Sequence, residues 1–138
     1  MIHGEIRLRP RYGEVDQMGY VYHANYVSYC HEARTELLRQ HGVNDFVLEK
    51  NNIMIPVIDF RISYKKPARY DEVLTISTKV TQFPEVRMGF EFEIRNENND
   101  LICMADSTIV FVSKKTRQPV RLPEFIEVRL KPLFSQLV

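Results

Sequence analysis

The sequence predicts an α+β fold in which one long helix lies against an antiparallel sheet of about five strands. Only one long stretch, residues 24–41, carries apolar residues at helical spacing. Four later stretches alternate apolar with polar residues, or are apolar throughout, as strands do. These strands follow one another without an intervening helix, and such an order favours antiparallel pairing.

Each expected element has its own justification. Residues 4–12 are predicted as the first strand, because Ile6 and Leu8 alternate with charged neighbours. The helix over 24–41 is followed by Gly42, a residue type that commonly ends helices. The remaining strands are expected at 58–65, 74–80, 87–95 and 101–113, with turns at 96–100 and 114–119 and with residues 125–131 as a candidate for one more strand. The stretch 101–113 is apolar on both faces, which indicates a strand inside the sheet.

The lengths of these elements suggest how they assemble. A helix of about 18 residues is roughly 27 Å long, and about eight strand residues cover the same distance. A sheet of such strands can therefore wrap around the one helix. Wrapping leaves the edge strands of the sheet open, and pairing with a second copy of the chain is the usual way to close them. We expect a homodimer at least.

Composition narrows the class of protein. The chain has 138 residues, which suits a single domain over 1–138. Its formal net charge of +1 provides no general attraction for nucleic acid. No apolar run approaches the roughly 20 residues of a membrane span, and the charged N-terminus does not resemble a signal peptide. Cys30 and Cys103 lie far apart in apolar settings. We therefore expect buried thiols in a reduced, cytoplasmic protein.

The stretch EVDQMGYVYHANYVSY, residues 14–29, holds the candidate site. Asp16 stands there among residues able to enter a core, namely Val15, Met18, Tyr20, Val21, Tyr22, Ala24, Tyr26 and Val27. A carboxylate in such surroundings costs free energy unless something compensates it. Gly19 permits a tight turn or a close approach to a ligand, and the first turn of the following helix presents unpaired N–H groups. An N–H near His23 or Ala24 can polarise a carbonyl oxygen while Asp16 acts on the carbonyl carbon.

Plainer interpretations of these residues remain open. Asp16 is also a typical turn-forming or capping residue, and His23 can be a structural histidine. Glu32 and Glu36 share a helix face and are a second candidate catalytic pair, although Glu36 also suits an ion pair with Arg39 or Arg34.

Two other chemistries are disfavoured. His31-Glu32 resembles the start of a zinc-protease motif, but Thr35 stands where the second histidine is needed. We therefore expect no metal site. Cys30 falls inside the apolar helix stripe with no adjacent base, which argues against a thiol nucleophile.

The same stretch resembles a known family. Asp16-Gln17-Met18-Gly19, Val21-Tyr22-His23 and Asn25-Tyr26 are similar to the signature of hotdog-fold acyl-CoA thioesterases, with the 4-hydroxybenzoyl-CoA thioesterase and YbgC-like group as the nearest branch. The segment EARTELL at 32–38 resembles the central helix of that family, and YKKPARYDE at 64–72 resembles a connection between two of its strands. The resemblance covers roughly residues 3 to 130.

The resemblance implies a helix wrapped by a curved antiparallel sheet, homodimers that can assemble into homotetramers, active sites at the dimer interface, and no metal or bound cofactor. It implies that Asp16 is the catalytic carboxylate, as nucleophile or general base. It also implies that the His23 N–H holds the thioester oxygen, with the His23 side chain near the reacting centre. The substrate is expected to be an acyl-CoA or an acyl-carrier-protein thioester. The expected substrate-binding residues are Gly19, Val21, Tyr22, Tyr26, Lys66 and Arg69.

Some of these expectations have alternatives. Many relatives carry aspartate two residues before the catalytic one, where this chain has Glu14, which keeps the charge and changes the reach. Tyrosines at 20, 22, 26 and 29 suit either an acyl pocket or the core. Lys65, Lys66 and Arg69 suit either the phosphates of coenzyme A or a solvated loop, and the basic turn of Lys114, Lys115 and Arg117 is a further candidate for the phosphates. A hotdog hydroxyacyl-thioester dehydratase and a non-catalytic acyl-CoA-binding dimer are the alternative functions.

Overall fold

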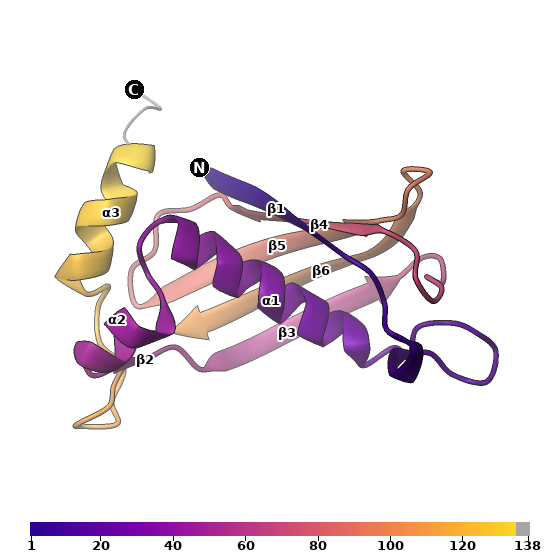
Figure 1. Ribbon diagram of the computed structural model, residues 1–138. Coiled ribbons are helices and arrows are strands. Elements are labelled where there is room, and N and C mark those ends of the chain that lie inside the picture. Colours follow the sequence, from indigo (N-terminus) through magenta and orange to yellow (C-terminus); the bar gives the residue numbers. More distant parts are fainter. Residues whose placement is uncertain (135–138) are drawn as a thin grey trace.

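The computed structural model describes residues 1–134, in which a five-stranded antiparallel sheet has one long helix lying along one of its faces (Figure 1). The strand order in the sheet is β1-β4-β5-β6-β3. The strands are β1 (Ile2–Leu8), β3 (Val57–Tyr64), β4 (Leu74–Val80), β5 (Arg87–Arg95) and β6 (Leu101–Val110), and the helix is α1 (Asn25–Gln40). The predicted fold class is confirmed.

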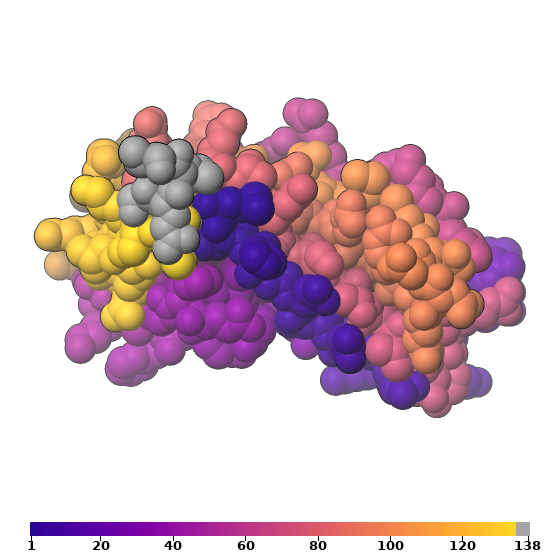
Figure 2. All heavy atoms as spheres, turned by 90° about the horizontal axis from the view of Figure 1, so that it is seen from above, coloured from indigo at the N-terminus to yellow at the C-terminus, as the bar shows by residue number. Residues whose placement is uncertain are grey.

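Shorter elements complete the chain. β2 (Ile53–Met54) pairs with β7 (Val112–Ser113) as a small second sheet. A 3-10 turn, η1 (Tyr12–Glu14), precedes the loop that leads into α1, and α2 (Asp45–Lys50) follows α1. The last described element is α3 (Glu124–Phe134), which lies beside the start of β1 (Figures 1 and 2). Among residues 1–134, no helix is both long and apolar enough to cross a bilayer.

The core lies between α1 and the sheet. Tyr26, Cys30, Ala33 and Leu37 form the buried stripe of α1, as the helical spacing predicts. They face a layer of buried strand residues that includes Leu74, Ile76, Met88, Phe90, Ile94 and Ile102. Burying so much apolar surface supplies most of the driving force for folding.

Three predictions about the strands are wrong. The first strand ends at Leu8 rather than at residue 12, because Pro10 lacks the N–H that a strand ladder requires. The predicted strand 101–113 is divided into β6 and β7. The predicted strand 125–131 is part of helix α3, in which Ile126 and Leu130, four residues apart, are buried.

The two edges of the sheet are β1 and β3. Figure 2 shows β1 at the surface of the molecule, beginning beside α3. At the other edge, β3 carries three large apolar residues that are each about half exposed, namely Val57, Ile58 and Tyr64. An edge strand with exposed apolar side chains offers its free backbone groups to a partner strand, so β3 is an unprotected edge in the isolated chain.

Candidate active site

The residues singled out by the sequence gather in the Asp16 loop, residues 15–22, which connects the 3-10 turn η1 to the start of α1. A bridge between Val15 and Val21 closes the loop at its base. Inside it, the Asp16 N–H donates to the Tyr20 carbonyl at 2.8 Å, and the Gly19 N–H donates to the Asp16 carbonyl at 3.0 Å. Gly19 has a φ of +81°, a backbone conformation that residues other than glycine rarely adopt. Of the tight turn and the close approach to a ligand that Gly19 permits, the structure shows the turn.

Asp16 is compensated by the backbone of its own loop. Its Oδ1 accepts hydrogen bonds from the N–H groups of Met18, at 2.9 Å, and Tyr20, at 3.2 Å. The carboxylate is thus the turn-forming residue that one interpretation of the sequence predicts. No described residue donates to Oδ2, so this oxygen keeps its lone pairs for other chemistry.

The surroundings of Asp16 differ from the sequence-based expectation. Asp16 itself is half-buried, and two of the apolar neighbours expected around it point into water, with Met18 71% exposed and Tyr22 51% exposed. Val27 is also exposed. The loop projects from the body of the protein, so its apolar residues cannot all reach the core. The free energy cost expected for a carboxylate in an apolar setting is correspondingly smaller.

The start of α1 supplies unpaired donors beside this loop. Ala24 is the N-cap residue, and no side chain caps the helix there. Among residues 1–134, no acceptor receives the backbone N–H of His23 or of Ala24. These donors carry the partial positive charge of a helix N-terminus. The arrangement can hold an oxygen that gains negative charge.

The exposed His23 is fixed at its backbone. Its carbonyl accepts a hydrogen bond from the Tyr64 hydroxyl at 3.1 Å. The His23 ring lies edge-on to the Tyr64 ring, with 6.2 Å between centroids, and beside the Tyr22 ring, with 4.5 Å between centroids. The imidazole therefore has an aromatic surface on two sides and water on the others.

Two of the expected substrate-binding residues belong to the core. Val21 is buried, and its N–H donates to the Ala68 carbonyl at 2.9 Å. Tyr26 is also buried, and its hydroxyl accepts the Ala68 N–H at 3.1 Å. Burial raises the pKa of the Tyr26 phenol. These contacts attach the end of the Asp16 loop to the segment after β3, whereas Tyr22 remains at the surface.

The expected cationic residues have different surroundings. Lys66 forms an ion pair with Asp100, with 2.7 Å between Nζ and Oδ2, and this hydrogen bond is the main reason that the pKa of Asp100 is lowered. The guanidinium of Arg69 lies over the Tyr20 ring, 5.2 Å from its centroid, and no described carboxylate pairs with it.

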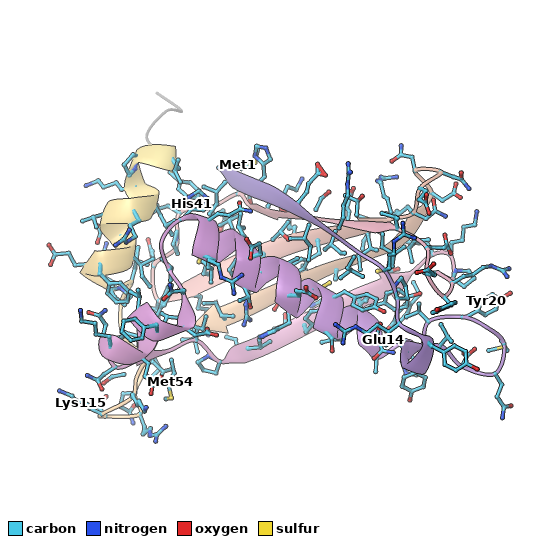
Figure 3. All side chains as sticks on the ribbon, viewed as in Figure 1. Met1, Glu14, Tyr20, His41, Met54 and Lys115 are labelled. Carbon is cyan, nitrogen blue, oxygen red and sulfur yellow. The ribbon has the colours of Figure 1, made fainter. Side chains whose placement is uncertain are left out.

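The basic turn around Lys115 lies far from the Asp16 loop within one chain. Figure 3 shows Lys115 and Met54 at one end of the molecule, and Glu14 and Tyr20 at the other. A hollow of about 650 Å³ lies over the sheet face that α1 does not cover. None of the expected catalytic or substrate-binding residues lines that hollow. The described chain therefore places its free N–H groups and Asp16 at an open surface.

Glu14 has a larger part in the site geometry than sequence reasoning assigned to it. Its Oε1 accepts the Arg11 N–H at 2.7 Å and the Tyr29 hydroxyl at 2.9 Å. Its carbonyl accepts the Tyr22 N–H at 2.8 Å and Nδ2 of Asn25 at 2.9 Å. The sequence alone does not predict the contact between Glu14 and Tyr29, because it does not determine the path of the loop between these two residues.

The structure also shows the surroundings of the cysteines and glutamates that were alternative catalytic candidates. Cys30 and Cys103 are buried, and burial raises the pKa of each thiol to about 12, so neither suits nucleophilic catalysis. Glu36 pairs with Arg39, as the plainer interpretation predicts. Among the described residues, no group of three His, Cys, Asp or Glu side chains is arranged to hold a metal ion.

Comparison with known proteins identifies the family of the chain. The family model described as the thioesterase-like superfamily matches residues 10–130. Acyl-CoA thioester hydrolase YbgC of Escherichia coli O6:H1 is 33% identical over 124 residues, which are 90% of this chain and 92% of that protein. The 1,4-dihydroxy-2-naphthoyl-CoA hydrolase of Synechococcus elongatus is 25% identical over 119 residues, or 85% and 87% of the two chains.

Solved structures give the same result for the fold. The crystal structure of a DHNA-CoA thioesterase from Staphylococcus aureus superimposes with a TM-score of 0.87 at 27% identity, covering 99% of this chain and 95% of the other. Fold and sequence comparisons thus converge on one group of enzymes. The chain belongs to the thioesterase-like superfamily and is a thioester hydrolase with the hotdog fold.

Proposed function

We propose that this protein hydrolyses an acyl-CoA thioester to a free carboxylic acid and coenzyme A, with Asp16 and the start of α1 as its catalytic centre. The proposal is supported by relatives named as acyl-CoA hydrolases. The observation that carries it is local. The N–H groups of His23 and Ala24 lack acceptors among the described residues. The Asp16 loop leads directly to these two residues, and it carries Asp16 with one carboxylate oxygen that accepts no described hydrogen bond.

In this mechanism the thioester carbonyl oxygen accepts the His23 N–H. The helix N-terminus then stabilises the negative charge that develops on this oxygen as the carbonyl carbon becomes tetrahedral. Asp16 acts on the carbon in one of two ways. It removes a proton from an attacking water, or it attacks directly and forms an anhydride that water then hydrolyses. In both routes the carbon–sulfur bond breaks, the coenzyme A thiolate leaves and takes up a proton, and the acyl group gains the oxygen of water.

Of Lys66 and Arg69, the two cations among the expected substrate-binding residues, Arg69 is the better candidate for the phosphates of coenzyme A. Lys66 is already paired with Asp100, and a phosphate would have to compete with that carboxylate. Arg69 is free of described carboxylates, and stacking on Tyr20 holds its guanidinium plane in place. A guanidinium can bind a phosphate through two parallel hydrogen bonds.

The proposed active form is a homodimer joined along β3. The unpaired edge of β3 and its exposed Val57, Ile58 and Tyr64 support this assembly. A two-fold axis would pair the two β3 strands antiparallel and extend the sheet across both chains. Because Tyr64 also contacts His23, such an interface would lie next to the proposed catalytic centre.

The first test measures free-thiol release from a panel of acyl-CoAs and an acyl-carrier-protein thioester, with the wild-type protein beside Asp16→Asn. Asparagine keeps the shape and hydrogen-bonding oxygen of the turn, and removes the charge. We expect wild type to turn over at least one thioester and Asp16→Asn to lose about 10²–10⁴-fold in kcat, the usual contribution of a general base. Equal rates for both proteins would leave Asp16 as a turn residue only. Binding without turnover would favour the acyl-CoA-binding alternative, and hydration of crotonyl-CoA would favour the dehydratase.

A further inference from the structure

Glu14 connects three segments that meet at the proposed catalytic centre. These are the turn η1 before the Asp16 loop, the end of that loop at Tyr22, and the first turns of α1 at Asn25 and Tyr29. We propose that Glu14, through its hydrogen bond to Tyr29, is a positioning residue that holds Asp16 at the distance from the His23 N–H that catalysis requires. This inference rests on the proposed function.

The side chain of Glu14 fixes the entrance of the loop to the helix. Its Oε1 is shared by the Arg11 N–H at 2.7 Å and the Tyr29 hydroxyl at 2.9 Å. Tyr29 is 3% exposed and lies edge-on to the Tyr26 ring, with 6.0 Å between the centroids. Burial is the main reason that the pKa of the Tyr29 phenol is raised. The hydrogen bond to Glu14 and the negative charge of Glu14 raise it further. The hydroxyl therefore stays protonated and donates to Glu14 throughout the working pH range.

The main chain of Glu14 fixes the exit of the loop. Its carbonyl accepts the Tyr22 N–H at 2.8 Å and Nδ2 of Asn25 at 2.9 Å. Tyr22 directly precedes His23, and Asp16 is two residues from Glu14. One residue thus controls both the carboxylate and the N–H that act together on the thioester.

Packing does not hold the tip of the loop. Its tip, residues 17–19, is exposed, and Gly19 would meet no atom within 4 Å even if it carried a Cβ. The position of Asp16 is therefore set at the two ends of the loop. Glu14 holds both ends through its hydrogen bonds, while Val15 packs against the core at one end and the Val21 N–H donates to the Ala68 carbonyl at the other. A shift of about 1 Å in a catalytic group can cost roughly 100-fold in rate.

Four variants separate positioning from chemistry and from folding. Glu14→Ala removes both side-chain bonds but leaves the main-chain bonds. Glu14→Gln keeps an acceptor oxygen and removes the charge. Tyr29→Phe removes only the hydroxyl, and keeps the test open if Glu14→Ala does not fold. Glu97→Ala is the matched control, because the exposed Glu97 side chain, in the turn between β5 and β6, also accepts a backbone N–H, that of Val73 at 3.1 Å.

We expect Glu14→Ala to lower kcat by about 10- to 100-fold with little change in KM, and Tyr29→Phe to lower kcat less. Glu14→Gln should keep most of the wild-type kcat, and Glu97→Ala all of it. Combining Glu14→Ala with Tyr29→Phe should cost little more than Glu14→Ala alone, because both remove the same contact. Thermal unfolding of every variant shows that the compared proteins are folded.

Two results would overturn the inference. A folded Glu14→Ala with wild-type kcat would mean that the contact does not position Asp16. Equal losses in Glu14→Gln and Glu14→Ala would assign a chemical role to the carboxylate itself. Failure of the proposed function looks different, because then either the wild-type protein turns over no thioester or Asp16→Asn keeps full activity, whatever happens at Glu14.

Discussion

The turn uses only one of the two oxygens of Asp16, which leaves the other for the proposed chemistry. Oδ1 holds the turn through the Met18 and Tyr20 N–H groups, and Oδ2 accepts no hydrogen bond from a described residue. The turn-forming and catalytic interpretations of the sequence are therefore compatible. The motif predicts this residue correctly as a turn former, but its half-exposed setting follows from the path of the loop, which residue types alone do not determine.

The two cysteines give a prediction about reactivity. Cys30 and Cys103 are both fully buried, and burial raises the pKa of each to about 12. Since the thiolate is the reactive form, both should react very slowly at pH 8. We expect DTNB to detect almost no thiol in the native protein and two thiols per chain in denaturant, the full count in the sequence. Rapid release of one equivalent from the native protein would contradict this burial.

At the scale of elements, α3 shows where alternation misleads. Ile126, Val128 and Leu130 alternate with charged residues, as in a half-buried strand. In the structure Ile126 and Leu130 are buried, whereas Val128 is 60% exposed. The buried residues therefore lie four positions apart, as on one face of a helix, and not two. Backbone hydrogen bonds from Ile126 and Glu127 to the Pro123 carbonyl begin the helix. A short segment can fit both periods, and only packing against the rest of the protein decides between them.

The end of α1 provides a matched pair of glycine variants. Gly42 has a φ of +79°, and its N–H donates to the Arg39 carbonyl at 2.9 Å. A Cβ at this position would also press against the guanidinium of Arg129. Gly42→Ala should therefore lower the free energy of unfolding by roughly 1–2 kcal/mol or more, measured by urea denaturation.

Gly89→Ala is its control, since Gly89 lies in β5 and a Cβ there meets nothing within 4 Å. Alanine should leave stability unchanged or raise it by up to about 1 kcal/mol. If both variants lose stability equally, the special backbone conformation of Gly42 is not what makes alanine costly there.

At the scale of the whole molecule, local patterns predict which segments are strands but not their order. β3 follows α1 in the chain yet pairs with β6 at the far edge, and β1 pairs with β4. Alternation shows that Leu74 and Ile76 face one side of a strand. It does not show which strand lies next to them, because any two strands with an apolar face can pair. The edge position of β3 therefore required the structure.

The assembly proposed along β3 can be measured directly. We expect the protein to have the mass of at least a dimer in light scattering at micromolar concentration. Ile58→Glu should shift it toward the monomer, because the introduced charges would lie against the partner strand and lose their hydration. Val128→Glu, a similar change at an exposed position of α3, should not. A monomeric wild-type protein, or equal behaviour of the two variants, would count against the β3 interface.

The burial of both native thiols also makes the protein convenient for spectroscopy. A cysteine introduced in place of Met18, at the exposed tip of the Asp16 loop, would be the one readily labelled thiol of the chain. A fluorophore or spin label attached there would report on the loop as acyl-CoA is added, with no need to remove the natural cysteines from the core first.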